Sequence, residues 1–355
     1  MQQHKIIRLL PVLVLAGWLL GSCDKGIKLD NLPLENLSDY GVYVGDLANL
    51  EYASDVIPYD LNTPLFSDYS FKDRLIKLPE GEVIEYTDQD VFDFPVGTMI
   101  FKTFSYPFDF RNPEAGRRII ETRVLALTEE GWQFYPYEWN EAQTDASYKP
   151  VISPKVVEWT HYDGSARSTI YIVPNEIECG NCHAVGNTET PIGPRAGNLN
   201  GSFDYLDGSA NQLQRWTERG WLTGTPDLSM VTQFAEWEDE SADLDNRARS
   251  YLDVNCAHCH RPDGDANNSG LFLNYENTDL TALGICKPPI ATGGGSGGLF
   301  YDIVPGNADS SIMVYRMNSV ELDEAMPEIG RSIIHTEGLE LISEWINDMD
   351  PVDCN

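Results

Sequence analysis

The stretch Cys256-Ala257-His258-Cys259-His260 holds two cysteines two residues apart, followed directly by a histidine. This C-x-x-C-H spacing is the attachment signature of a c-type haem. Two thiols on one turn of chain can each bond a vinyl group of the same porphyrin, and the adjacent histidine can then ligate the iron. We therefore predict that Cys256 and Cys259 form thioethers with a haem, and that His260 is an axial ligand of its iron.

A second copy of the same spacing stands upstream, at Cys179-Gly180-Asn181-Cys182-His183. It predicts a second haem, bonded to Cys179 and Cys182 and ligated by His183. The cofactors expected are therefore two c-type haems with their iron. The alternative for each copy is a zinc site or a disulfide pair that happens to precede a histidine, because short motifs also occur by chance.

The composition narrows the class of partner. The chain has 355 residues, which suggests about two domains, and a formal net charge of −32. Such a charge argues against nucleic acid, whose phosphates would be repelled. It favours docking to a redox partner with a basic face, because complementary fields speed encounter. The alternative is a solvated acidic surface without a specific partner.

Residues 1–22 have the pattern of an export signal. Lys5 and Arg8 precede an apolar run over residues 9–20, which is too short to span a bilayer comfortably. The end of the run, Leu20-Gly21-Ser22-Cys23, resembles a bacterial lipobox. That resemblance implies cleavage before Cys23, its lipidation, and an exported protein anchored to a membrane, facing the periplasm or at the cell surface. The alternative is an ordinary secretory signal with an incidental cysteine.

Two of the seven cysteines remain after the anchor and the two haem motifs, namely Cys286 and Cys354. In an oxidising compartment such a pair is most simply a disulfide. A free or metal-binding pair is the alternative. The disulfide would tie the C-terminal end of the chain to a glycine-rich loop.

The rest of the chain predicts a multidomain α+β protein. Residues 23–39 look like a tether, and residues 40–175 form an all-β domain, sandwich-like or barrel-like, because short runs of β-branched and aromatic residues alternate with turn signals. The expected strands cover residues 74–78, 82–86, 98–106, 117–127, 132–138, 155–162 and 168–173. Residues 176–239 are the first haem-attachment segment and a linker, with a short helix at 211–219.

Residues 240–355 carry helical signals. Ser241 is a plausible N-cap, and Leu244, Ala248 and Leu252 then share one face of a helix that leads into Cys256. A second amphipathic helix is expected around residues 339–346. Between the two helices, Met326 precedes a proline in a loop, so we predict that its thioether is the sixth ligand of the second haem iron. Met313 and Met317 are competing candidates, but they suit core packing better.

This part of the chain resembles a class I cytochrome c domain, which implies an all-helical fold, a His/Met iron and one-electron transfer. The matching parts are the helix into residues 256–260, and residues 301–307, 326–330 and 344–346. The chain from about residue 38 onward also resembles a family of bacterial dihaem c-type cytochromes of unassigned role. That resemblance rests on residues 59–69, 139–145, 173–175 and 192–194 and on the C-terminal part with Cys286 and Cys354. It implies haem binding and electron transfer.

The sixth ligand of the first haem is not predicted, since His161, Met230 and Met99 all stand where ordinary packing is the simpler role. The expected function is one-electron transfer outside the cytoplasm, and an electron carrier is favoured over an enzyme. One alternative is a dihaem peroxidase-type enzyme with one open iron. Another is a haem-bearing sensor or ligand-binding surface protein.

Overall fold

The fold is described from a computed structural model, which covers residues 27–186, 188–290, 292 and 294–354. The predicted signal peptide, residues 1–22, and the predicted lipidation site Cys23 lie outside the described residues. Within the described part of the chain, no helix is both long and apolar enough to cross a membrane.

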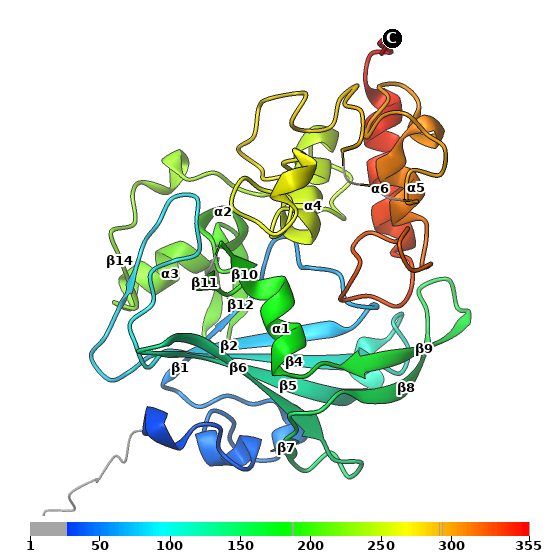
Figure 1. Ribbon diagram of the computed structural model, residues 1–355. Coiled ribbons are helices and arrows are strands. Elements are labelled where there is room, and N and C mark those ends of the chain that lie inside the picture. The colour runs from blue at the N-terminus through cyan, green and yellow to red at the C-terminus, as the bar shows by residue number, and fades with distance from the viewer. Residues whose placement is uncertain (1–26, 187, 291, 293, 355) are drawn as a thin grey trace, which may run out of the picture.

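The centre of the molecule is one antiparallel sheet of six strands (Figure 1). Its spatial order is β1 (Val56–Tyr59), β2 (Phe71–Lys77), β4 (Met99–Pro107), β5 (Arg117–Thr128), β6 (Gly131–Trp139) and β7 (Ala146–Tyr148). Sequential strands are neighbours, apart from the two-residue β3, as expected where short turns join antiparallel strands. The strands are rich in Ile, Val, Phe, Tyr and Thr, whose branched or aromatic side chains pack well on a pleated surface.

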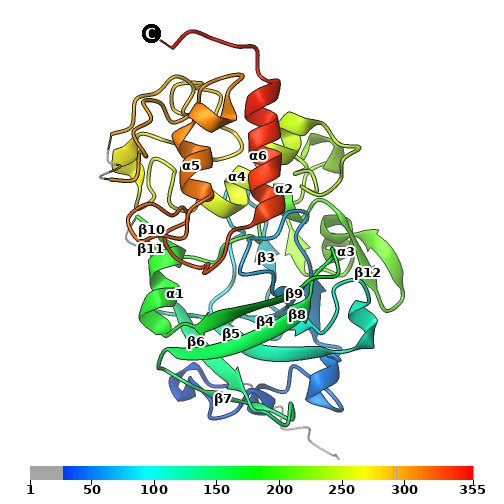
Figure 2. The same ribbon diagram turned by 90° about the vertical axis from the view of Figure 1, so that its right-hand side faces the viewer.

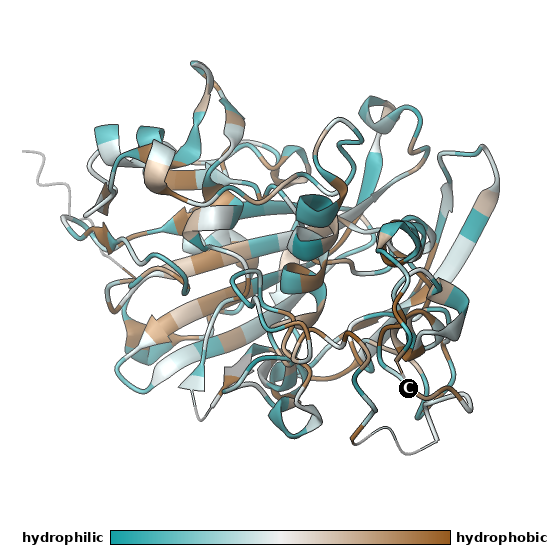
Figure 3. Cartoon of the chain, turned by 90° about the horizontal axis from the view of Figure 1, so that it is seen from above, coloured by the Kyte–Doolittle hydropathy of each residue, from teal (hydrophilic) through white to brown (hydrophobic). Residues whose placement is uncertain are grey.

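Both faces of this sheet are covered. Apolar and polar segments succeed one another along its strands (Figure 3), and alternate residues point to opposite faces. On one face, Phe101 and Val124 pack with Tyr40 from the N-terminal segment, which contains three short 3₁₀ helices. These helices are η1 (Leu29–Asn31), η2 (Leu37–Tyr40) and η3 (Leu47–Asn49). On the other face, Ile100 and Leu125 belong to a core cluster completed by residues 196–231.

Smaller elements complete the second face. The hairpin of β8 (Ser153–Thr160) and β9 (Ala166–Val173) lays Trp159 and Tyr171 against Phe104 and Tyr106 of β4. The other short elements of this part are β3 (Ile84–Glu85), η4 (Pro113–Ala115), α1 (Glu176–His183), β10 (Ala184–Val185), β11 (Thr188–Glu189), α2 (Ala196–Leu199), β12 (Ser202–Tyr205), β13 (Gly208–Asn211), α3 (Gln212–Glu218), β14 (Leu222–Thr223) and η5 (Leu228–Met230). The buried Trp216 of α3 joins this layer to the sheet.

The C-terminal part has three α-helices, α4 (Leu244–Cys256), α5 (Ile312–Met317) and α6 (Thr336–Asp348), with the 3₁₀ turns η6 (Asn267–Ser269) and η7 (Ala308–Ser310). Helices α4 and α6 lie side by side (Figure 2), and their apolar faces meet through Leu252 and Ile342. The indole Nε1 of Trp345 also donates to the carboxylate of Asp245 across 2.7 Å.

The predicted fold class is wrong. The structure is β-rich, and the described residues from 240 onward do not form an all-α domain. Long segments at 257–290, 294–311 and 318–335, with no helix beyond the 3₁₀ turns η6 and η7, separate α4, α5 and α6. This part also packs directly on the β-rich part, where the Tyr69 hydroxyl donates to Glu337 across 2.6 Å. The sheet is open, with β1 and β7 at its edges, and β8 and β9 form a separate two-stranded sheet that packs on β4, so the expected sandwich or barrel is not seen either.

Candidate functional site

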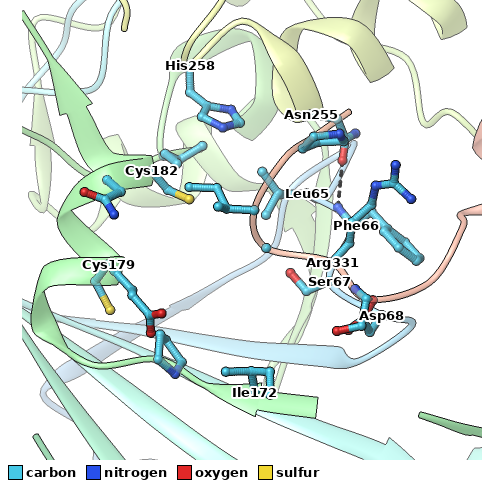
Figure 4. A pocket seen from close by; sticks show the side chains of 18 of the residues that line it. Leu65, Phe66, Ser67, Asp68, Ile172, Cys179, Cys182, Asn255, His258 and Arg331 are labelled. Atoms are coloured by element: carbon cyan, nitrogen blue, oxygen red, sulfur yellow. Dashed lines mark hydrogen bonds between the residues drawn. The ribbon is translucent and has the colours of Figure 1, made fainter. Parts of the chain in front are cut away.

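The two C-x-x-C-H segments approach each other at one cavity. It has a volume of about 310 Å³ and lies between the central sheet, α1, the end of α4 and residues 326–335. That volume is at the lower end of the range of small-molecule and cofactor sites, about 300–1,000 Å³. Figure 4 shows Cys179 and Cys182 on one side of it, and Phe66, Asp68 and Arg331 on the other.

Helix α1 carries the first pair of cysteines. Asn175 and Glu178 begin the helix by reciprocal capping: the Asn175 side chain accepts from the Glu178 amide at 2.9 Å, and the Glu178 carboxylate accepts from the Asn175 amide at 3.2 Å. Three residues apart on a helix, Cys179 and Cys182 share one side of it, and both line the cavity. Both thiols are free, and burial raises the pKa of Cys179 to about 11.

His183 ends the same helix, and its ring is oriented by the β10–β11 hairpin. Its Nδ1 lies 2.8 Å from the carbonyl oxygen of Thr190. Because a carbonyl only accepts, Nδ1 must carry the proton, and Nε2 then keeps its lone pair. Burial lowers the pKa of His183 to about 3, so the ring is neutral. A neutral imidazole whose Nδ1–H is held by a carbonyl is the arrangement that metal-ligating histidines usually have.

Helix α4 leads into the second motif. It begins at the Asp243 cap, whose carboxylate accepts from the Asn246 amide at 3.0 Å. The chain continues as a helical turn beyond Cys256, because the amides of Cys259 and His260 both donate to the Cys256 carbonyl, at 3.2 and 2.9 Å. Cys256 and Cys259 therefore lie on one turn of chain, both thiols are free, and burial raises the pKa of Cys256 to about 12.

Only some of the predicted residues of the second motif line the cavity. Cys256 lines it, whereas Cys259 and His260 are not among its lining residues. The Nδ1 of His260 lies 3.3 Å from the Ser269 hydroxyl, and burial lowers the pKa of His260 to about 4. His260 is therefore also neutral.

Met326 lines the cavity, as does Met317 at the end of α5. The segment that carries Met326 is fixed by the guanidinium of Arg331. Its Nη2 donates to the carbonyls of Ser319 at 2.7 Å and Met326 at 2.9 Å. Met313, like Met317, packs against the α4–α6 core.

The sheet contributes a row of cations to this side of the molecule. Arg74, Lys102 and Arg123 are cross-strand neighbours on β2, β4 and β5, and the last two line the cavity. Like charges opposite each other are destabilising. Asp60 is the partner of Arg74, and the fully buried Glu121 pairs with Arg123 at 2.6 Å. Burial and these neighbouring arginines lower the pKa of Lys102 to about 7.

The segment 59–69, one of those that carried the family resemblance, is a buried polar connection rather than a source of ligands. The side chain of Asn198 holds both backbone groups of Thr63, at 2.8 and 3.0 Å. The amide of Phe66 donates to Asn255 of α4 across 2.8 Å, the bond drawn in Figure 4. Asp68 accepts from the Ser332 amide at 2.7 Å. The segment thus joins the sheet to α2, α4 and residues 326–335.

One residue of the site, His258, was not predicted from the sequence, although it is the third residue of the second motif. It lines the cavity, and Figure 4 shows it above Cys182, beside the end of α4. It also lines a second cavity of about 170 Å³, again together with Cys182 and His183. Its only signal in the sequence is a second histidine within C-A-H-C-H.

The three weak candidates for the sixth ligand of the first haem do not line the cavity. Met99 is buried in the sheet core, and Met230 is 77% exposed. His161 is buried, with its Nδ1 3.2 Å from the Trp159 indole nitrogen and its Nε2 3.4 Å from the Glu337 carboxylate. Away from the cavity, Cys286 and Cys354 are joined by a disulfide.

Among the described residues, no group of three or more His, Cys, Asp and Glu side chains is arranged to hold a metal ion. No family model, no curated protein and no solved structure matches the chain. With a β-rich fold and no all-α C-terminal domain, these findings overturn the predicted membership of the bacterial dihaem cytochrome family and the predicted class I cytochrome c domain. Any function must therefore be argued from the two motifs and the cavity themselves.

Proposed function

We propose that this chain is an exported electron-transfer protein with two covalently bound haems, one at Cys179 and Cys182 and one at Cys256 and Cys259. The observation that supports the proposal best is that both C-x-x-C-H segments meet at one cavity, lined by Cys179, Cys182 and Cys256, while all four thiols of the two motifs are free. Segments 77 positions apart in the sequence, with the same rare spacing, have no structural need to meet in this way.

The residues around the cavity suit the group. Helix α1 presents two thiols on one side, the geometry that two thioether bonds to one porphyrin require. The bond from His183 Nδ1 to the Thr190 carbonyl keeps Nε2 free to ligate iron. When bound, haem would supply a one-electron iron couple, which these side chains cannot provide.

For the second haem, His260 and Met326 remain our proposed axial ligands. The Ser269 hydroxyl next to Nδ1 orients the His260 ring, and Arg331 fixes the backbone of Met326. A thioether ligand opposite histidine raises the reduction potential, which suits a carrier that accepts electrons readily.

The setting of the protein is part of the proposal. We place it outside the cytoplasm, anchored through a lipid on Cys23, with a redox partner that has a basic docking face. The net charge of −32 supports such a partner, because an acidic surface attracts a basic one. Salt screens this attraction. The rate of reduction by the partner should therefore fall as ionic strength rises, and a salt-independent rate would count against a basic partner.

The decisive experiment measures covalent haem in the purified exported protein. We expect two haems per chain from the intact mass and from the haem absorbance after denaturation. The double variant Cys179→Ala/Cys182→Ala should retain one haem, and so should Cys256→Ala/Cys259→Ala. Covalent haem survives denaturation, whereas zinc or a disulfide adds no such mass or absorbance.

The matched control removes the other cysteine pair. Cys286→Ser/Cys354→Ser deletes two cysteines that are joined to each other, away from the cavity, and should keep both haems. A wild-type chain without covalent haem, when produced in a host that attaches haem to exported proteins, would refute the proposed function.

A further inference from the structure

Among the described histidines, only His183 and His258 line both cavities. The ring of His258 lines both cavities in company with Cys182 and His183, so the two histidines border the same space from opposite elements, α1 and the turn after α4. The Nδ1 of His258 is buried, and no contact to it meets hydrogen-bond geometry among the described residues. A buried polar atom without a good partner costs free energy, and a group bound in this space would offset that cost.

The remaining histidines have other positions or partners. His4 lies outside the described residues. His161 does not line the cavity, and both of its ring nitrogens have partners. His335 does line it, but its Nδ1 lies 2.9 Å from the Tyr251 hydroxyl and its ring is stacked on Phe66 at 4.2 Å. His260 is the proposed ligand of the second haem.

We infer that His258 is the second axial ligand of the haem held by Cys179, Cys182 and His183. This inference rests on the proposed function. An imidazole has the ring nitrogens that iron accepts as ligands, and the ring of His258 lines the cavity together with Cys182 and His183. The second motif therefore contributes to both haems, with His258 to the first and His260 to the second.

Two consequences separate this arrangement from an open iron. With imidazole on both sides, the first haem is six-coordinate and low-spin and does not bind carbon monoxide when reduced. The two ligands His258 and His260 are also two residues apart, so their Cα atoms are within about 7 Å of each other. The potentials of the two haems should therefore depend on each other.

The test combines haem content with the spectrum of the reduced protein and its uptake of carbon monoxide. Wild-type protein should bind none. His258→Ala should keep two covalent haems, become high-spin at one of them, and bind one carbon monoxide per chain. Added imidazole should return His258→Ala to the low-spin spectrum, and His258→Met should stay low-spin with a higher potential at one haem.

The control is His161→Gln, which replaces a buried histidine away from the cavity and should leave the spin state and the uptake of carbon monoxide unchanged. If His258→Ala loses haem, His258→Met tests the same ligand with a side chain that can still bind iron. Absence of covalent haem in the wild type would refute the proposed function. Two other results would refute the role of His258 and leave the proposed function standing. One is a wild type with two haems that binds carbon monoxide. The other is a wild type with two haems whose His258→Ala variant stays low-spin and binds no carbon monoxide.

Discussion

Replacement of Arg331 by methionine should loosen the segment of residues 326–335 that closes one side of the cavity. The guanidinium of Arg331 is half-buried, and its Nη2 donates to the carbonyls of Ser319 and Met326 at 2.7 and 2.9 Å. A longer contact of 3.3 Å joins Nη1 to the Ile333 carbonyl. Methionine keeps the apolar stem but can make none of these bonds.

The size of the effect follows from the two short bonds. A hydrogen bond from a charged donor contributes about 1.5–3 kcal/mol, so their loss alone would cost roughly 3–6 kcal/mol. Part of this is offset, because burial already disfavours the charge of Arg331 and lowers its pKa. The methionine variant no longer carries that desolvation cost. We therefore expect the free energy of unfolding to fall by about 2–4 kcal/mol.

Urea denaturation of the full chain measures the global change, and amide hydrogen exchange locates it. The amide of Met326, which donates to the Arg316 carbonyl at 3.0 Å, should lose protection before the amides of α4 do. The control is Arg167→Met, because Arg167 is about half exposed and its pair with Asp163 should contribute less than about 1 kcal/mol. A loss below about 1 kcal/mol for Arg331→Met, or unchanged exchange at Met326, would refute this role.

Three other changes test other parts of the structure. Asn198→Ala removes the side-chain partners of the amide and carbonyl of the buried Thr63, so the free energy of unfolding, measured by thermal unfolding, should fall by about 2–4 kcal/mol. An Asn198→Ser variant as stable as the wild type would contradict this. Lys102 has its pKa lowered to about 7, so the unfolded chain binds more protons between pH 7 and 10. The free energy of unfolding of the wild type should thus rise with pH across that window, by less than about 1.4 kcal/mol per pH unit because Lys102 is partly exposed. Lys102→Met should flatten this rise, and parallel pH profiles of the two proteins would contradict the lowered pKa. Reduction of the Cys286–Cys354 disulfide, which spans 68 residues, should cost about 4 kcal/mol by loop entropy, and equal denaturation midpoints with and without reductant would contradict that value.

Strands β2, β4, β5 and β6 of the central sheet could be predicted from sequence, because each is a run of β-branched and aromatic residues bounded by turn residues, whereas β1 and the three-residue β7 were not predicted. The strand expected at 117–127 is β5 at Arg117–Thr128, and that expected at 98–106 is β4 at Met99–Pro107. β1 was missed because Pro58 interrupts its run, and Pro is tolerated only where no ladder hydrogen bond is needed. The sheet order explains the exception, since β1 lies at an edge.

The prediction of an all-α domain failed in the C-terminal part. The helical periods of α4 and α6 were read correctly, but they do not determine the structure of the residues between these two helices. Helices α4 and α6 cover the expected residues, although the cap of α4 is Asp243 and not Ser241. Residues 257–311 have no helical period. They are held instead by side chains that bind backbone carbonyls, such as Arg249, which donates to Tyr275 at 2.7 Å. Such bonds leave no periodic signal in a sequence.

For the candidate site, too, some features could be predicted from the sequence and others could not. The two motifs could be found from sequence, because C-x-x-C-H is a local spacing. Their meeting at one cavity could not, since it depends on how α1 and α4 pack on the sheet. His258 was not predicted for the same reason. What sets it apart is that it lines a cavity together with His183, which stands 75 positions earlier in the sequence.

The walls of the cavity also set an order of assembly. They come from residues near 66, 102, 123, 179, 256 and 331, so the space cannot close until nearly the whole chain has left the ribosome. Contacts so distant in sequence form late, because the loop entropy must be lost first. Both cysteine pairs precede the last wall, residues 326–335, in the chain. A nascent chain that ends near residue 320 would therefore present the thiols of Cys179, Cys182 and Cys256 at an open cavity, and the C-terminal segment would cover them last.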